Sequence, residues 1–259
     1  MELDEIAWGD VLVDTGDVIV CQGEFDQDAV LVKRWSAGAL DAELAARRRL
    51  QAAGVATASL LGSGPGWMVL EDLGETIWRP ASHADMDDPN TLTALGAWFA
   101  SAHRLPGDDL PRSDAEQVLT PAVVEAAASL LGASSRATLA EHVSGWLDLS
   151  HGAQQRLQVG GLDQNGVAVV GAGMDAMVTD LSAAHGVPVA DDLCAVRAVL
   201  DDAAWEHFRS GYRAHGSWPD EEQLQAQEGL ALTLRLVVQA LTGQDISDDA
   251  QTALHGLWS

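Results

Sequence analysis

The stretch AVLVKRW, residues 29–35, contains the only lysine of the chain, Lys33. Its apolar and β-branched residues predict a strand. The other 13 basic residues are arginines. Because an ammonium group is compact and a guanidinium is a planar fork, the one retained lysine is a candidate for a specific ligand contact. A cation at the end of a strand is also common without any function, so the lysine alone leaves both interpretations open.

A helix is predicted over residues 40–53, ending before Gly54. It contains Glu43, ten residues after Lys33, and an arginine cluster at residues 47–49. We interpret this cluster as favourable positive charge near the helix C-terminus. Short β-rich runs separated by glycine-containing turns surround the helix, at residues 11–13, 18–21, 57–61 and 67–70.

From Gly74 onward the pattern changes from strands to helices. Apolar residues recur at helical spacing from residue 90 to His103 and in several later segments. A strand-rich island interrupts the helices at about residues 157–180. The sequence therefore predicts an α+β protein whose first part is β-rich and whose second part is helical.

The composition is that of a globular protein. With 259 residues and 47% hydrophobic residues, the chain can bury a sizeable core. No apolar run approaches the roughly 18 residues of a membrane span. The acidic start of the sequence lacks the basic residues of a signal peptide, and Cys21 and Cys194 are too few and too distant for a disulfide scaffold. We therefore expect a cytoplasmic protein.

The formal net charge is −25. Nucleic acids and anionic membranes are bound through basic patches, so the charge argues against both as partners. It favours a cationic small molecule or a basic protein partner through long-range steering. The same charge could also serve only to keep the protein in solution.

Several segments, in their order and spacing, are similar to those of one kinase family. WMVLEDLG at residues 67–74 is similar to its hinge strand, which receives adenine, and LGAWFASAH at residues 95–103 to its long helix. VTD at residues 178–180, followed by Asp192-Leu193, is similar to its metal-binding strand and the helix after it. On these segments and Lys33, the chain resembles the aminoglycoside phosphotransferase and choline-kinase-like family over most of its length.

This resemblance implies a two-lobed protein-kinase-like α+β fold. Residues 1–73 would form a small β-rich N-lobe with one main helix. Residues 74–259 would form a larger helical C-lobe that contains the β-island. The cofactors implied are ATP and Mg²⁺.

The resemblance also assigns roles to individual residues. Lys33 would pair with Glu43 and contact the nucleotide phosphates. Backbone groups of Glu71 and Leu73 would receive adenine, and Asp180 would bind the metal ion.

The catalytic loop departs from the family pattern. Where the family has His-Gly-Asp-Leu, three further residues and Asn, this chain has VGGLDQNGV at residues 159–167. Gly161 therefore stands at the position of the base, and Gly166 at that of the metal-binding asparagine. A register starting at His151-Gly152 also lacks the aspartate and spoils the spacing to Asp192. Glycine has no carboxylate to accept the proton of the substrate hydroxyl and no side-chain amide oxygen for a second Mg²⁺.

Two nearby residues could replace the missing groups. Asp163 is the candidate catalytic residue, with Asn165 beside it. The string DQNG at residues 163–166 is equally typical of a turn, because Asn-Gly is a strong turn signal.

The segments that would grip the phosphates are also atypical. Glycines are scattered through residues 15–17 and 23–24, and a lone glycine turn is weak evidence for a phosphate loop. The nearby carboxylates would repel a triphosphate unless they point away from it; they are Asp17, Glu24, Asp26 and Asp28.

Two main functional hypotheses follow, and repurposed chemistry in the same cleft is a third. The first is a pseudokinase, a ligand- or protein-binding accessory protein whose ATP-dependent phosphoryl transfer is lost or very weak. The alternative is an active small-molecule kinase with shifted catalytic residues, which phosphorylates a hydroxyl of a cationic amino sugar or amine. The sequence names neither the ligand nor the oligomeric state.

Overall fold

The computed structural model of the protein describes residues 3–36, 40–111, 119–128, 133–159, 162, 166–171, 173–182 and 184–242. The chain forms two compact units. The first comprises Met1–Pro111, Arg156–Gly186 and Ala195–Trp218, and the second Arg112–Gln155, Val187–Cys194 and Pro219–Ser259. Each unit combines segments that are far apart in the sequence, whereas the predicted lobes are continuous. The predicted lobe boundary after residue 73 stays a prediction.

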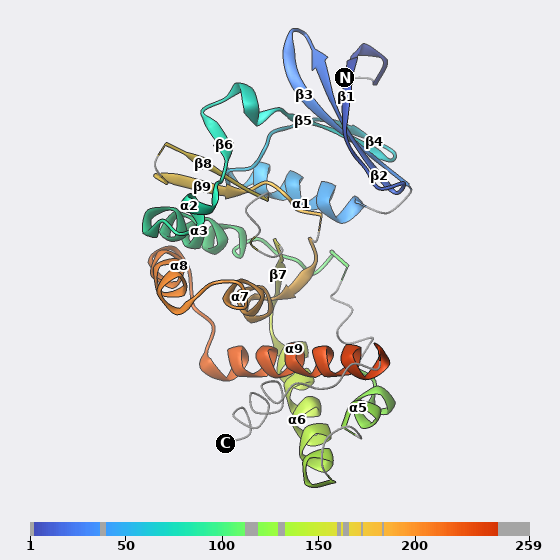
Figure 1. Ribbon diagram of the computed structural model, residues 1–259, viewed down its shortest axis with the longest axis vertical. Coiled ribbons are helices and arrows are strands. Elements are labelled where there is room, and N and C mark those ends of the chain that lie inside the picture. The colour runs from blue at the N-terminus through green and yellow to red at the C-terminus, as the bar shows by residue number, and fades with distance from the viewer. Residues whose placement is uncertain are drawn as a thin grey trace. The chain divides into compact units, whose positions relative to one another are not determined.

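The N-terminal part of the first unit is a five-stranded antiparallel sheet with the strand order β1-β2-β3-β5-β4 (Figure 1). A short 3₁₀ helix, η1 (Leu3–Glu5), precedes it. The strands are β1 (Ala7–Asp14), β2 (Val18–Phe25), β3 (Asp28–Trp35), β4 (Leu60–Gly64) and β5 (Trp67–Glu71). Tight hairpin turns join β1 to β2, β2 to β3 and β4 to β5. In the turn between β2 and β3, Asp26 and Gln27 both have positive φ, as a two-residue hairpin requires.

Helix α1 (Asp41–Ala52) follows β3 and packs on one face of this sheet. Leu40, which precedes the helix, and Leu44 in its first turn belong to one apolar cluster with Trp35 and Leu31 of β3. Because side chains alternate along a strand, Lys33 lies on this same face, between Leu31 and Trp35. The predicted end of the helix is confirmed, since Gly54 adopts the left-handed conformation common just after a helix.

A second sheet of three antiparallel strands has the order β6-β8-β9. The strands are β6 (Trp78–Pro80), β8 (Val167–Val170) and β9 (Asp175–Val178). The sequence predicts β8 and β9 within the island at residues 157–180 but does not predict β6. With three residues, one of them proline, β6 has no recognisable alternation of its own and forms because it pairs with β8.

Two helices of the first unit, α3 (Pro89–Ala102) and α8 (Asp202–His215), pack closely. A Cβ atom on Gly96 of α3 would overlap the carbonyl oxygen of Phe208, and one on Gly211 of α8 would overlap that of Thr93. These two glycines therefore let the two backbones touch. The 3₁₀ helix η2 (Leu73–Glu75) and the short helix α2 (His83–Met86) complete the connection from β5 to α3.

The second unit is built from helices. Those within it are α5 (Pro121–Ala128), α6 (Ala133–Gly152) and α9 (Glu221–Thr242). Their apolar side chains form one core that includes Leu139, Trp146 and Leu236. Strands β7 (Gln155–Leu157) and β10 (Gly186–Pro188) and helix α7 (Val189–Arg197) lie where the chain passes from one unit to the other.

The fold class is α+β, with a β-rich N-terminal sheet and a helical C-terminal part, as predicted. No helix within the described residues is both long and apolar enough to cross a membrane.

Candidate functional site

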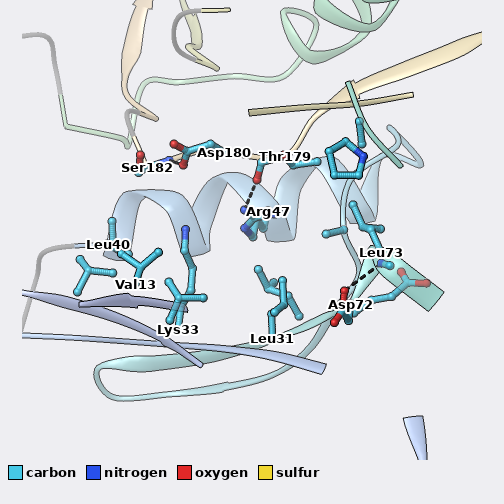
Figure 2. Close-up of a pocket in the computed structure, with 18 of the residues that line it drawn as sticks. Val13, Leu31, Lys33, Leu40, Arg47, Asp72, Leu73, Thr179, Asp180 and Ser182 are labelled. Carbon is cyan, nitrogen blue, oxygen red and sulfur yellow. Dashed lines mark hydrogen bonds between the residues drawn. The ribbon is translucent and has the colours of Figure 1, made fainter. Parts of the chain in front are cut away.

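A pocket of about 670 Å³ opens within the first unit, between the N-terminal sheet with α1 on one side and β8 with the segment after β9 on the other. Figure 2 shows Lys33 on one side of it and Asp180 on the other. Its apolar walls come from both sheets, with Val18 and Leu31 on one side and Ala168 on the other. The polar residues that line it are Thr15, Lys33, Arg47, Glu71, Asp72, Thr179, Asp180 and Ser182.

Lys33 and Glu43 form the predicted ion pair. The Nζ atom of Lys33 lies 2.9 Å from both carboxylate oxygens of Glu43. The Glu43 side chain is fully buried, and 15% of the Lys33 side chain remains exposed in the pocket. A buried glutamate therefore holds the lysine in place while its ammonium group stays accessible to a ligand.

Glu43 is shared with a second cation, Arg47. The Nε and Nη2 atoms of Arg47 donate to Glu43 Oε1 at 2.9 and 2.6 Å. Nη2 also donates to the carbonyl of Thr179 at 2.6 Å, the contact drawn in Figure 2. Attributing the arginine cluster to the helix dipole is therefore wrong for Arg47, which is 1% exposed and bonded inside the protein. Its spacing of four residues from Glu43 is the signal that identifies it.

Asp180 follows β9 by two residues and lines the same pocket as Lys33, as predicted. The partial loss of water around its carboxyl acts to raise the pKa. Hydrogen bonds from Ser182 and the positive charges of Lys33 and Arg47 outweigh this effect and hold the pKa of Asp180 below its ordinary value. The group is therefore a carboxylate near neutral pH, as a metal ligand must be.

The segment from Glu71 to Gly74 closes one end of the pocket. Glu71 is held by Ser59, whose hydroxyl donates to Glu71 Oε2 at 2.7 Å. Asp72 Oδ1 accepts the N–H group of Gly74 at 2.9 Å. Leu73 begins the one-turn helix η2, so its N–H group has no acceptor within that helix. The two predicted adenine contacts, Glu71 and Leu73, both line the pocket.

Comparisons with solved structures identify the fold that carries this pocket. The macrolide 2'-phosphotransferase from Brachybacterium faecium superposes with a TM-score of 0.60 at 16% identity, covering 99% of this chain and 92% of that one. The choline kinase from Streptococcus pneumoniae superposes with a TM-score of 0.59 at 13% identity, covering 97% and 92%. The chain has the aminoglycoside phosphotransferase and choline-kinase-like fold.

A spectinomycin phosphotransferase, solved in complex with ADP and spectinomycin, shares this fold with a TM-score of 0.57 at 13% identity. The superposition covers 97% of this chain and 87% of the spectinomycin phosphotransferase. By sequence, no protein-family model and no curated protein matches the chain.

Of the two positions predicted to bind the metal ion, 166 and 180, only Asp180 has a side chain that could hold one. Gly166 lies beside Asp180, because its carbonyl accepts the N–H group of Thr179 at 2.7 Å and a Cβ on it would lie 3.3 Å from Asp180 Cβ. The expected asparagine position is thus next to Asp180 but carries no side chain. Asp180 alone suits a Mg²⁺ ion that arrives with phosphates, since Mg²⁺ often takes one or two carboxylates and completes its shell with phosphate oxygens and water.

The segment predicted to be the catalytic loop is described only in part. Gly161, Asp163 and Asn165 lie outside the described residues, so the catalytic role assigned to Asp163 stays a prediction. Among the residues that the structure describes, no group of three or more His, Cys, Asp or Glu side chains is arranged to hold a metal ion.

In the turn between β1 and β2, backbone N–H groups donate to side chains of the turn itself. The N–H group of Gly16 donates to Asp14 Oδ1 at 2.9 Å, and that of Val18 to Thr15 Oγ1 at 3.1 Å. These N–H groups are therefore occupied rather than offered to phosphates. Of the carboxylates expected to repel a triphosphate, only Asp17 lies in this turn, because Glu24, Asp26 and Asp28 lie at the far ends of β2 and β3.

Proposed function

We propose that this protein binds an adenine nucleotide in the pocket and that its phosphoryl transfer is lost or very weak. The observation that carries the proposal is that Lys33, held by the buried Glu43, lines the same pocket as the carboxylate of Asp180. An accessible ammonium and a carboxylate, set in an apolar pocket of this size, suit a phosphate chain attached to a flat apolar base.

The base would lie between the apolar side chains of the two sheets. The carbonyl of Glu71 and the N–H group of Leu73 would meet its edge, and Lys33 would meet the phosphates. When bound, Mg²⁺ would neutralise phosphate charge, and Asp180 would hold it. Each of these groups lines the pocket or belongs to a residue that does.

Two glycines at predicted catalytic positions and the hydrogen bonding of one turn support the loss of phosphoryl transfer. Gly161 has no carboxylate to accept the proton of a substrate hydroxyl, and Gly166 has no amide oxygen for a metal ion. The Asp14–Gly16 hydrogen bond occupies a donor that a phosphate would otherwise use. The protein would then act by binding, as an accessory protein for a small molecule or for a protein partner of basic character, in keeping with its net charge of −25.

The alternative is an active small-molecule kinase in which Asp163 acts as the base. It is favoured by the solved proteins of this fold, which include a choline kinase and a phosphotransferase holding ADP and spectinomycin. The −25 charge also suits a cationic acceptor. A steady-state assay separates the two functions, because only the alternative releases ADP in the presence of an amine or amino-sugar acceptor.

The single lysine offers a direct test of nucleotide binding. An amine-acylating reagent can modify only Lys33 and the N-terminal amine, so mass spectrometry follows one internal site. We expect Mg²⁺-ATP to slow acylation of Lys33 but not of the N-terminal amine. It should also raise the melting temperature, since a ligand at 100 times its Kd stabilises the native state by about 2.7 kcal/mol.

The Lys33→Met variant is the control for the melting experiment, because it lacks the phosphate contact and should show a smaller shift. Millimolar Mg²⁺-ATP that neither protects Lys33 nor raises the melting temperature of the wild-type protein would refute the proposal.

A further inference from the structure

Arg47 is among the largest fully buried side chains of the described protein. Burial of a guanidinium is costly unless its donors find acceptors. Arg47 makes two hydrogen bonds to Glu43 and one to the carbonyl of Thr179. Its Nη1 atom also donates to Thr57 Oγ1 at 3.4 Å. Thr179 is 132 positions farther along the chain.

These bonds join three parts of the pocket. Lys33 projects from β3 and Glu43 from α1, while Thr179 lies between β9 and Asp180. The carboxylate of Glu43 is fixed from two sides, by Lys33 and by Arg47. Arg47 hydrogen-bonds both to Glu43 and to the backbone that leads to Asp180.

The backbone of Thr179 is likewise held at both ends. Its N–H group donates to Gly166 at 2.7 Å, and its carbonyl accepts from Arg47 at 2.6 Å. The next residue, Asp180, accepts the N–H group of Ser182 at 3.0 Å. Fixing the peptide of Thr179 therefore restricts the direction in which the Asp180 side chain enters the pocket.

We propose that Arg47 is a positioning residue that links the Lys33–Glu43 pair to the Thr179–Asp180 backbone. It would thereby fix the position of Asp180 relative to Lys33 across the pocket. It acts through Glu43 and Thr179 rather than through the ligand. Its planar fork suits this task, because it can donate in two directions at once, whereas a lysine offers a single compact charge. Its positive charge also contributes to the lowered pKa of Asp180.

Hydrogen exchange of the unliganded protein tests the link without any nucleotide. In Arg47→Met, exchange at the N–H groups of Thr179 and Ser182 should quicken by about tenfold or more, because their segment loses an anchor. Arg48→Met is the matched control: Arg48 is the next residue of the same helix and donates to Ser63 at the protein surface. This control should leave exchange at Thr179 and Ser182 unchanged.

The affinity of the pocket for Mg²⁺-ATP gives a second measurement, which rests on the proposed function. We expect Arg47→Met to weaken binding about tenfold and Arg48→Met to leave it unchanged. If wild-type protein does not bind Mg²⁺-ATP, the proposed function is wrong, while the exchange measurement still decides the role of Arg47.

Arg47→Lys keeps the experiment decisive if the methionine variant does not fold. This variant retains the positive charge, so it should fold, yet it cannot reach Glu43 and Thr179 together. Faster exchange confined to residues near Thr179 supports the link. Unchanged exchange there, or an increase spread evenly over the first unit, would show that Arg47 only fills the core and would overturn the proposal.

Discussion

The Nζ atom of Lys33 lies 2.9 Å from each carboxylate oxygen of Glu43, ten residues farther along the chain. The carboxylate is fully buried and is shared with Arg47, which is 1% exposed. One anion thus compensates two cations that both border the pocket, Lys33 with 15% of its side chain exposed and Arg47 with 1%. Its removal affects the pocket and the stability of the fold together.

Glu43→Gln should be strongly destabilising. The substitution keeps the shape of the side chain but leaves Arg47 buried without its counter-charge. Removing one partner of a buried pair typically costs about 3–5 kcal/mol, and we expect a fall in the free energy of unfolding of this size in urea titrations. Glu24→Gln, at an exposed position of β2, should change it by less than about 0.5 kcal/mol. Equal effects of the two substitutions would contradict our account of the pair.

Turnover of ATP should be negligible in the wild-type protein and should rise when the missing groups are restored. A general base typically contributes about 10²–10⁴-fold to the rate, so Gly161→Asp with Gly166→Asn should raise the rate with an amine or amino-sugar acceptor. The new side chain at position 166 must shift Asp180 slightly, since its Cβ would lie 3.3 Å from Asp180 Cβ. Wild-type turnover at about 1–100 s⁻¹, typical of kinases, would instead support the active-kinase alternative.

Gly96→Ala should destabilise the packing of α3 against α8. The added methyl group would overlap the carbonyl oxygen of Phe208, which is backbone and cannot rotate away. We expect a loss of about 1–3 kcal/mol in the free energy of unfolding. Gly145→Ala in α6 is the control, because its Cβ would meet nothing within 4 Å, and it should instead stabilise by about 0.5–1 kcal/mol. A neutral Gly96→Ala would mean that the two helices pack less closely.

The stabilising effect of Asp85 should depend on pH. Hydrogen bonds from Arg79 and Ser82 hold the pKa of Asp85 well below its ordinary value. A carboxyl whose pKa is lowered on folding stabilises the protein above its ordinary pKa, and this stabilisation is lost as the pH falls toward the folded value. Asp85→Asn should therefore lower the melting temperature at about pH 7, with a difference that shrinks below about pH 4. Thermal melts across this range, with Asp10→Asn as control, test the sign, and a difference independent of pH would contradict it.

If the protein works by binding a basic ligand or partner, their association should slow as salt rises from low to physiological concentration. The net charge of −25 attracts a basic partner from a distance. At physiological ionic strength, salt screens this attraction beyond about 8–10 Å. Stopped-flow or surface-binding kinetics should show the effect in the association rate and much less in dissociation. Association that does not change with salt would indicate that the charge serves only solubility.

Local patterns in the sequence determined much of the N-terminal sheet and its helix. The apolar run around Lys33 predicted a strand, and Gly54 marked the end of the next helix, because strands and helix ends depend on neighbouring residues. The ion pair with Glu43 and the place of Asp180 in the same pocket followed from the resemblance. Both are confirmed.

Tertiary structure decided what depends on distant segments. Strand β6 exists because β8 pairs with it, and the occupied N–H group of Gly16 depends on how the Asp14 side chain turns back. Arg47 could be placed near Glu43 from spacing, but its burial and its bond to Thr179 could not be predicted. The residues are 132 positions apart, and no local periodicity encodes a contact made only when the chain has folded.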